Sequence, residues 1–412
     1  MKYYPLRPIQ RWLVDTHFNK AKSTMMNIGG LCKLSASIDM NHLASAINYV
    51  LENHDIFRCR FVFHPETSDL CQTFDSELEK VFVEEMSEAQ FKKHMDKMRE
   101  PYYLIDQPLY RIYLMQTPRA KYIYADFYHA IMDGVSILYL FWREVDAAYR
   151  GRKKARALSY AEYVEEEAAI PAENLAEGQA YWRKIISSFD GKKHLPPTKI
   201  EGDTKWAKGE FHCEFKNFME EFFRATHLDE NNYFMGAAML TLAKITGSGE
   251  SLISWTHNGR MTMPERRLMG LMLEQIPCAW DFRENISIGE FLNRLNGQTR
   301  IGMKYRKSLG TIYDSGIEGD LVTFIFQKNL YDNIVLADTL ALPIYLPPNE
   351  ISAAENALDI EVCATETGKY KLNLNFDASR YSEIDMHNFA ATMNKILLDM
   401  RDMNKKFSEI LG

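Results

Sequence analysis

The chain has 412 residues, a hydrophobic fraction of 46% and a formal net charge of −7 at pH 7. This length exceeds what one hydrophobic core usually serves, so it predicts two domains. The acidic balance argues against a nucleic acid as partner, because binding phosphates requires a basic face. No apolar run approaches about 18 residues, which argues against a membrane span.

The cysteines and the N-terminus limit the class of protein further. The six cysteines are widely spaced and form no CxxC pair, so we expect no zinc site, no other metal site and no dithiol redox site. Residues 1–15 carry charges within their apolar part, unlike the uninterrupted apolar core of a secretory signal. These features predict a cytoplasmic protein with reduced cysteines.

Helical and strand patterns alternate along the chain, which predicts an α/β fold. Hydrophobic periodicity in the first third predicts a helix over 41–51 and strands over 57–63, 109–115 and 122–128. Ser87 and Gln90 have the spacing of a capping box, which predicts that a helix begins there and runs to about Met98.

The run from His129 to Gly134, H-A-I-M-D-G, follows the last of these strands. By strand alternation His129 ends an apolar row that includes Ile123 and Phe127. Burial there favours the neutral imidazole that a general base requires. Asp133 follows four residues later, where Gly134 is expected to close a turn. A buried structural histidine is the alternative interpretation of the run by itself.

An amphipathic helix follows the motif and is expected to end at Gly151, a natural left-handed cap. The basic cluster 152–156 comes next. It either complements the dipole of that helix or meets an acidic carrier protein or the phosphates of CoA. A change in composition over 159–208 predicts the domain boundary in that segment, with a first domain over 1–165, a linker over 166–208 and a second domain over 209–412.

The second domain repeats the alternation of helices and strands. Ser287 and Glu290 form another capping box. The remaining elements are expected as helices over 231–245, 287–304 and from 382 onward, strands over 251–256 and 321–327, and a hairpin of 358–362 with 370–376.

Segments 5–13, 52–61, 128–134, 160–163, 258–260 with 269–277 and, weakly, 323–330 occur in one order along nearly the whole chain. Together they resemble the motifs of nonribosomal peptide synthetase condensation domains and of the related CoA-dependent acyltransferases. The run Tyr128–Gly134 is similar to the family core H-H-x-x-x-D-G, with Tyr128 in place of the first histidine. Residues 272 and 274–275 also depart from the family pattern.

The resemblance implies two lobes similar to chloramphenicol acetyltransferase, forming a V-shaped pseudo-dimer with a central tunnel. It implies that His129 is the catalytic residue. It also implies that Asp133 pairs with Arg260 and that both, with Gly134, support the site. Tyr128, Trp255 and Thr256 are candidates for lining the tunnel, although Tyr128 lies on the opposite face of its strand and also suits a packing role.

The function implied is that of a free-standing acyltransferase of nonribosomal peptide or other secondary-metabolite synthesis. An acyl group would pass from a phosphopantetheine thioester, on a carrier protein or CoA, to an amine or hydroxyl acceptor. His129 would act as general base or positioning residue, with no permanently bound cofactor. The sequence ends at Gly412 without an adenylation or carrier domain, so we expect a carrier in trans. The alternative is a catalytically inactive module that recruits a carrier protein or another partner.

Overall fold

The computed structural model describes residues 2–152, 158–187, 195–199, 208–215, 219–311, 322–328, 334–344, 346, 356–365 and 369–412. The chain divides into two compact units. The first comprises Met1–Ile170, Arg260–Leu273 and Leu330–Ser352, and the second comprises Pro171–Gly259, Glu274–Asn329 and Ala353–Gly412.

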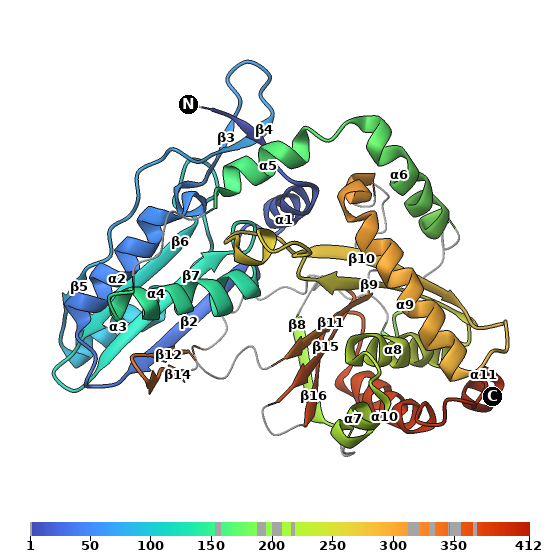
Figure 1. Cartoon of the computed structure of the whole chain (residues 1–412). Coiled ribbons are helices and arrows are strands. Elements are labelled where there is room, and N and C mark those ends of the chain that lie inside the picture. Colours follow the sequence, from blue (N-terminus) through green and yellow to red (C-terminus); the bar gives the residue numbers. More distant parts are fainter. Residues whose placement is uncertain are drawn as a thin grey trace. The chain divides into compact units, whose positions relative to one another are not determined.

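The first unit is built on a five-stranded sheet (Figure 1). Its strands, in spatial order, are β14 (Leu342–Ile344), β2 (Asn27–Leu34), β7 (Lys121–Tyr128), β6 (Tyr110–Gln116) and β5 (Val83–Glu85). Neighbouring strands are antiparallel except for β5 and β6. Helix α3 (Glu88–Met98) packs on one face through Phe91 and Met98, and the predicted capping box of Ser87 and Gln90 forms at its start.

Strand β7 positions the run His129–Gly134, which begins directly after its last residue. Side chains on successive strand residues point to opposite faces. Phe127 lies on the face that receives Phe57 and Phe141, with ring centroids 6.3 and 5.3 Å away. Tyr124 lies on the other face and stacks on Tyr113. The predicted strand is therefore confirmed, and residue 129 follows directly at its end.

The helix after the motif begins with a π-helical turn over Ser136–Phe141 and continues as α4 (Trp142–Tyr149). Gly151 follows with a φ of +72°, as predicted for a left-handed cap. α4 packs against α2 (Met40–Asn53), the helix expected over 41–51. In the basic cluster 152–156, residues 153–156 lie outside the described residues.

A smaller three-stranded sheet completes the first unit. It pairs β1 (Tyr4–Pro5) with β4 (Leu70–Thr73) and β4 with β3 (Arg60–Phe63). Helix α1 (Pro8–Asn19) follows β1 directly. The strand expected over 57–63 is shorter than predicted, because its first residues belong to a 3₁₀ turn at Asp55–Arg58.

The second unit has a six-stranded sheet. Its strands, in spatial order, are β10 (Glu274–Asp281), β9 (Glu250–His257), β11 (Val322–Lys328), β15 (Leu358–Ala364), β16 (Tyr370–Asp377) and β8 (Lys208–Glu214). The predicted hairpin is confirmed, since β15 and β16 pair in antiparallel register.

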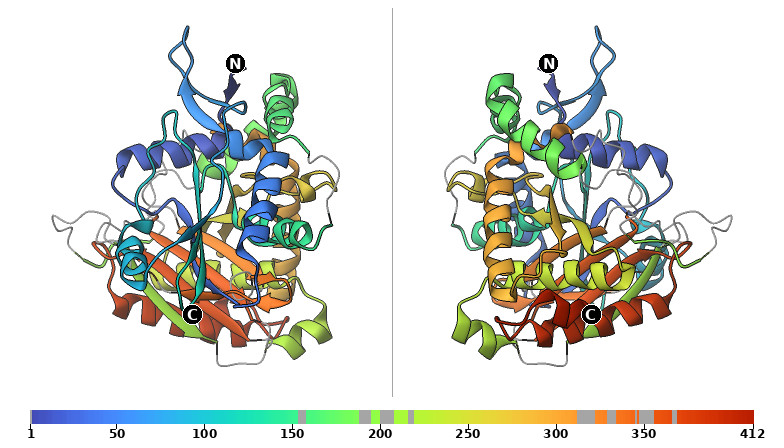
Figure 2. Two further views of the ribbon diagram at one scale, coloured as in Figure 1. Left: turned by 90° about the vertical axis from the view of Figure 1, so that its left-hand side faces the viewer. Right: turned by 90° about the vertical axis from the view of Figure 1, so that its right-hand side faces the viewer.

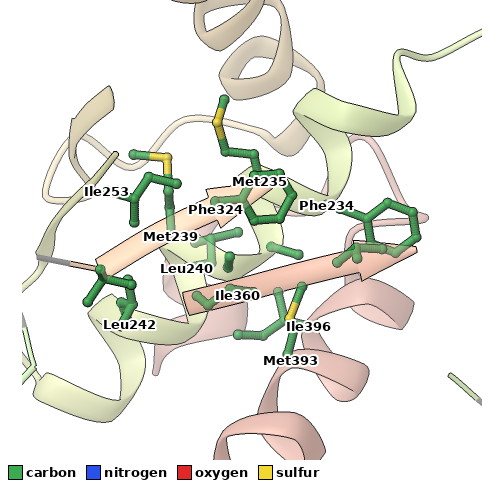
Figure 3. Close-up of a cluster of buried hydrophobic side chains, with 14 of the residues drawn as sticks. Phe234, Met235, Met239, Leu240, Leu242, Ile253, Phe324, Ile360, Met393 and Ile396 are labelled. Atoms are coloured by element: carbon green, nitrogen blue, oxygen red, sulfur yellow. The ribbon is translucent and has the colours of Figure 1, made fainter. Parts of the chain in front are cut away.

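Helices α8 (Glu230–Thr246) and α10 (Glu383–Asp399) pack against each other and against this sheet (Figures 1 and 2). Phe234 and Leu240 of α8 meet Phe324 of β11 and Ile360 of β15, while Met393 comes from α10 (Figure 3). All five side chains are fully buried. The two helices and the sheet thus share one core of buried side chains.

The observed units differ from the division of the sequence at 165 and 208. Residues 260–273 and 330–352 were assigned to the second domain, yet they belong to the first unit. The physical reason is pairing, since β14 adds to β2 and Arg260 bonds to Asp133. The expected linker includes part of α5 (Tyr160–Ala168) and all of α6 (Ala172–Ser187). Its residues 188–194 and 200–207 lie outside the described residues.

Candidate active site

His129 follows the last residue of β7, and its backbone is fixed there. Its N–H donates to the carbonyl of Met26 at 2.8 Å, and Ile131 N–H donates to Tyr128 O at 3.0 Å. Ala130, Ile131 and Met132 are fully buried, whereas His129 is half-buried. The loop therefore holds one imidazole at the edge of a dry interior.

The ring of His129 has a defined tautomer. Its Nδ1 lies 3.2 Å from the carbonyl oxygen of Met132. A carbonyl oxygen only accepts, so Nδ1 carries the proton and Nε2 keeps its lone pair. Among the described residues Nε2 has no hydrogen-bond partner. Burial lowers the pKa of His129 below 6.5, and the contact of the ring with its own backbone, the charge of Asp133 and the hydrogen bond to Met132 only partly offset this. The ring is thus neutral near pH 7, with a free basic nitrogen.

The carboxylate of Asp133 lies in a network of hydrogen-bond donors. It accepts from Arg260 Nη1 at 2.8 Å, from Arg260 Nη2 at 3.1 Å and from the N–H groups of Ser136 and Met272, both at 2.8 Å. Burial alone would raise the pKa of Asp133, but the charge and hydrogen bonds of Arg260 bring it below its ordinary value. Asp133 therefore stays ionised and braces the loop.

Arg260 completes this network from the segment that returns to the first unit. Its Nη2 also donates to Ser136 Oγ at 2.7 Å. That hydroxyl donates to Gly270 O at 2.7 Å and accepts from Gly270 N at 2.9 Å. Both charged side chains are at most 4% exposed. In a buried bidentate ion pair of this kind, loss of either partner leaves the other as an unpaired buried charge, which is strongly destabilising.

Residues 268–272 are held by the N-terminal part of the unit as well. Leu271 O accepts from Tyr160 Oη at 2.8 Å and from Arg7 Nη1 at 2.6 Å. A Cβ on Gly270 would lie 2.2 Å from Cδ2 of Tyr160. Glycine is thus required at 270 by close packing, and the segment is fixed from both sides.

Gly134 has a different role from the one expected. The turn covers residues 129–131 and ends before Gly134, whose φ is not in the left-handed region. The prediction that Gly134 closes the turn is therefore wrong. A Cβ at this position would meet nothing within 4 Å. Gly134 instead borders a cavity of about 330 Å³ in the first unit. The glycine leaves room beside the motif.

Apolar side chains make up most of the wall of this cavity. They come from β2, β7, β14 and the helix after the motif, and include Ile28, Leu31, Ile137, Leu138 and Trp142. One polar group in the wall is Asp126, whose Oδ2 accepts from Asn27 Nδ2 at 2.7 Å. Burial raises the pKa of Asp126 to about 6. An apolar cavity with few polar groups is typical of small-molecule sites.

Tyr128 is a core residue. It has no exposed surface, and its ring meets those of His17, Phe61 and Tyr102 at 5.5 to 6.3 Å. The expectation that it packs into the structure is confirmed. A lining role is wrong for this side chain, because a wall residue must expose some surface.

Trp255 and Thr256 lie in the second unit, at the end of β9. Trp255 Nε1 donates to Asn231 Oδ1 at 3.0 Å, and Thr256 Oγ1 donates to Gln275 Oε1 at 3.2 Å. Trp255 is 7% exposed. Their proposed lining role stays a prediction.

Several residues of the site were missed or underused by sequence reasoning. Ser136 and Asp126 carry no motif signal, and their partners lie far away in the chain. Gln10 and Tyr160 fell within segments that resemble the family, but nothing local indicated what they contact.

Within the described ranges, no cluster of three His, Cys, Asp or Glu side chains could hold a metal ion. No described helix is long and apolar enough to span a membrane.

The model of the condensation domain family matches residues 1–410 of the chain. The chain belongs to the condensation domain family. A linear gramicidin synthase of Brevibacillus parabrevis is 23% identical over 397 residues, which cover 90% of this chain and 7% of that protein. Gramicidin S synthase 2 of Aneurinibacillus migulanus is 20% identical over 316 residues, which cover 71% of this chain and 7% of that protein. The chain thus spans only a small part of the length of the curated relatives it matches.

Solved structures share the fold of this condensation domain. The condensation domain of the Monacolin K polyketide synthase MokA has a TM-score of 0.81 at 17% identity, covering 99% of both chains. The starter condensation domain of rhizomide synthetase RzmA, in complex with C8-CoA, has a TM-score of 0.76 at 16% identity over 99% of this chain and 97% of that one. The X-domain of teicoplanin biosynthesis, in complex with OxyB, has a TM-score of 0.76 at 15% identity, covering 100% and 96%.

Proposed function

We propose that this condensation domain is an acyltransferase that uses an acyl-phosphopantetheine thioester as donor. The acyl group passes to an amine or hydroxyl acceptor, which forms an amide or an ester and releases the thiol. The donor handle is a carrier protein or CoA, and no resident cofactor takes part. The proposal places the reaction at His129.

One observation carries the proposal, namely the orientation of the His129 imidazole. With Nδ1–H engaged by Met132 O, the lone pair of Nε2 is left for a substrate. A lowered pKa keeps this nitrogen unprotonated near pH 7. A positioned base that takes the proton of an attacking amine or hydroxyl contributes roughly 10²–10⁴-fold to the rate.

Asp133 supports this chemistry without moving protons. Its oxygens are occupied by Arg260, Ser136 and Met272. It therefore holds the loop in place while its charge favours the imidazolium that forms during transfer. Arg260 supports the site through its ion pair with Asp133. Gly134 supports it by leaving room for the cavity beside the motif.

The cavity beside Gly134 supports an acyl donor with an apolar body. Its volume of about 330 Å³ falls in the range of small-ligand pockets. Its wall from Ile137 to Trp142 is continuous in sequence with the motif. A structural neighbour in complex with C8-CoA is consistent with this assignment.

The experiment is product detection by mass spectrometry. The full chain is incubated with acyl-CoA and acyl-carrier thioesters of two to ten carbons together with small amines and alcohols. His129→Ala is run in parallel, and His212→Ala, which alters an exposed histidine of β8, serves as control. Products that depend on His129 and persist in the control support the proposal. Equal product from wild type and His129→Ala, or none from any pair, contradicts it.

The second candidate is an inactive module that recruits a partner. Tyr128 in place of the first family histidine favours it, as does a structural neighbour found in complex with OxyB. An acyl-carrier protein immobilised at a sensor surface separates the two. A recruiting module binds the carrier and yields no product, and an enzyme consumes the acyl group during the same contact.

A further inference from the structure

The side chains of Gln10 and Gln72 form a reciprocal pair of amides. Gln10 Nε2 donates to Gln72 Oε1 at 3.0 Å, and Gln72 Nε2 donates back to Gln10 Oε1 at 2.9 Å. Neither residue has any exposed surface. Gln10 lies in the first turn of α1, and Gln72 lies in β4. The pair thus joins two elements of the first unit in a dry environment.

The remaining positions of the Gln10 amide reach the motif and the N-terminal segment. Its second N–H donates to Ala130 O at 2.9 Å, and its oxygen also accepts from Arg7 N at 3.0 Å. All four hydrogen-bonding positions of this amide are therefore used. The second N–H of Gln72 goes to Pro5 O at 2.9 Å, away from the motif. Only one of the two glutamines contacts the loop of His129.

The contact with Ala130 falls at a sensitive point. Ala130 is the first of three buried residues between His129 and Asp133. Its carbonyl belongs to the peptide that leads to Ile131, so its direction sets the path of the chain toward Met132. The carbonyl of Met132 in turn holds Nδ1 of His129.

We infer that Gln10 is a positioning residue for His129, and this inference rests on the function proposed above. Gln10 fixes the Ala130 carbonyl, which keeps Met132 O against the ring and leaves Nε2 as the basic nitrogen. An amide is needed because the position must donate to Ala130 and accept from Arg7 at once. A carboxylate would place an acceptor against the Ala130 oxygen. Gln72 pairs with Gln10 but does not hold it in place alone, because the contacts of Gln10 with Arg7 N and Ala130 O do not depend on Gln72.

The test compares Gln10→Met with Gln72→Met in the full chain. Both changes remove one member of the buried pair and keep its volume and neutrality, so both are expected to lower the melting temperature. ¹⁵N NMR of protein that carries ¹⁵N-labelled histidine reports the tautomer and pKa of the His129 ring. The His129 signals are assigned by their absence from the His129→Ala spectrum. These spectra need no substrate, so they test the inference even when the thioester panel yields no product.

Gln10→Met is expected to give His129 a mixture of tautomers and a higher pKa, because the loosened loop admits water. With an active donor and acceptor, kcat is expected to fall about 10²-fold with little change in KM. Gln72→Met is expected to keep the single Nδ1–H tautomer and most of kcat when assayed below its melting temperature. Wild-type spectra for Gln10→Met, or equal changes of the His129 signals in both variants, would overturn the inference.

Discussion

Two histidines end central strands of the two units, and their backbone contacts give them opposite tautomers. His129 follows β7, and its Nδ1 donates to Met132 O. His257 ends β9, and its Nδ1 accepts from Gly259 N–H at 3.0 Å. The first ring keeps its proton on Nδ1, and the second therefore keeps it on Nε2 when neutral.

The comparison teaches that a histidine at a strand end is not by itself a base. Burial lowers the pKa of both rings, and for His257 the charge of Arg306 adds to this and brings the pKa to about 4. Asp133 acts in the opposite direction on His129. Of these two rings, His129 thus combines a free Nε2 with a carboxylate that favours its protonated form during transfer.

The largest expected difference between the two histidines is in turnover. His129→Ala is expected to lower kcat by roughly 10²–10⁴-fold, because the positioned base is lost. His257→Ala is expected to stay close to wild type. Initial rates with the most active thioester and acceptor measure both. Equal losses would show that the tautomer contrast has no bearing on catalysis.

The bracing of the His129 loop gives the next contrast. Asp133→Ala leaves Arg260 as a buried unpaired charge and is expected to lower the free energy of unfolding by about 3–5 kcal/mol. The exposed pair of Glu284 and Arg294 supplies the control, since Glu284→Ala is expected to cost less than about 1 kcal/mol. Urea unfolding measures both. Similar costs would mean that the Asp133 network contributes little.

His257 is expected to make stability depend on pH. Its pKa rises from about 4 in the folded chain to about 6.5 when unfolded, so the unfolded state binds the extra proton first. The stability that it contributes is complete above pH 6.5 and is lost as the pH falls toward 4, by up to roughly 3 kcal/mol. The difference in unfolding free energy between wild type and His257→Gln, measured from pH 7 to 4, reports this. A constant difference would contradict the buried neutral state.

Two glycines of the first unit give the smallest expected effects. Gly134→Ala is expected to be as stable as wild type. Gly270→Ala is expected to lower the free energy of unfolding by about 1–3 kcal/mol, because its Cβ would meet Tyr160. Gly134→Val is expected to slow transfer of long acyl chains more than short ones. Thermal unfolding and rates across the chain-length series test these points. Equal slowing at every chain length would show that the cavity does not hold the acyl chain of the donor.

Local chemistry made much of the fold predictable. The apolar alternation of Ile123 and Phe127 correctly placed residue 129 at the end of a strand. Ser87 and Ser287 begin helices as their spacing indicates, and Gly247 ends one with a φ of +65°. These signals act over a few residues, which is why sequence reasoning reaches them.

The elements that were missed lack such signals. Gly29 and Gly30 weaken the strand pattern of β2, and Arg7 at the start of α1 is not one of the usual capping residues. The site depends on longer connections. The pair of Asp133 and Arg260 was expected only from resemblance to the family, and nothing local indicates that Gln10 meets Ala130.

The chain leaves the first unit after Ile170 and supplies it again with Arg260–Leu273 and Leu330–Ser352. A fragment cut at the apparent end of the N-terminal half would retain Asp133 without its guanidinium and β2 without β14. We therefore expect it to aggregate on its own. A chimera of this domain and a relative should exchange the whole domain. A crossover near residue 170 would combine Asp133 of one parent with the Arg260 position of the other.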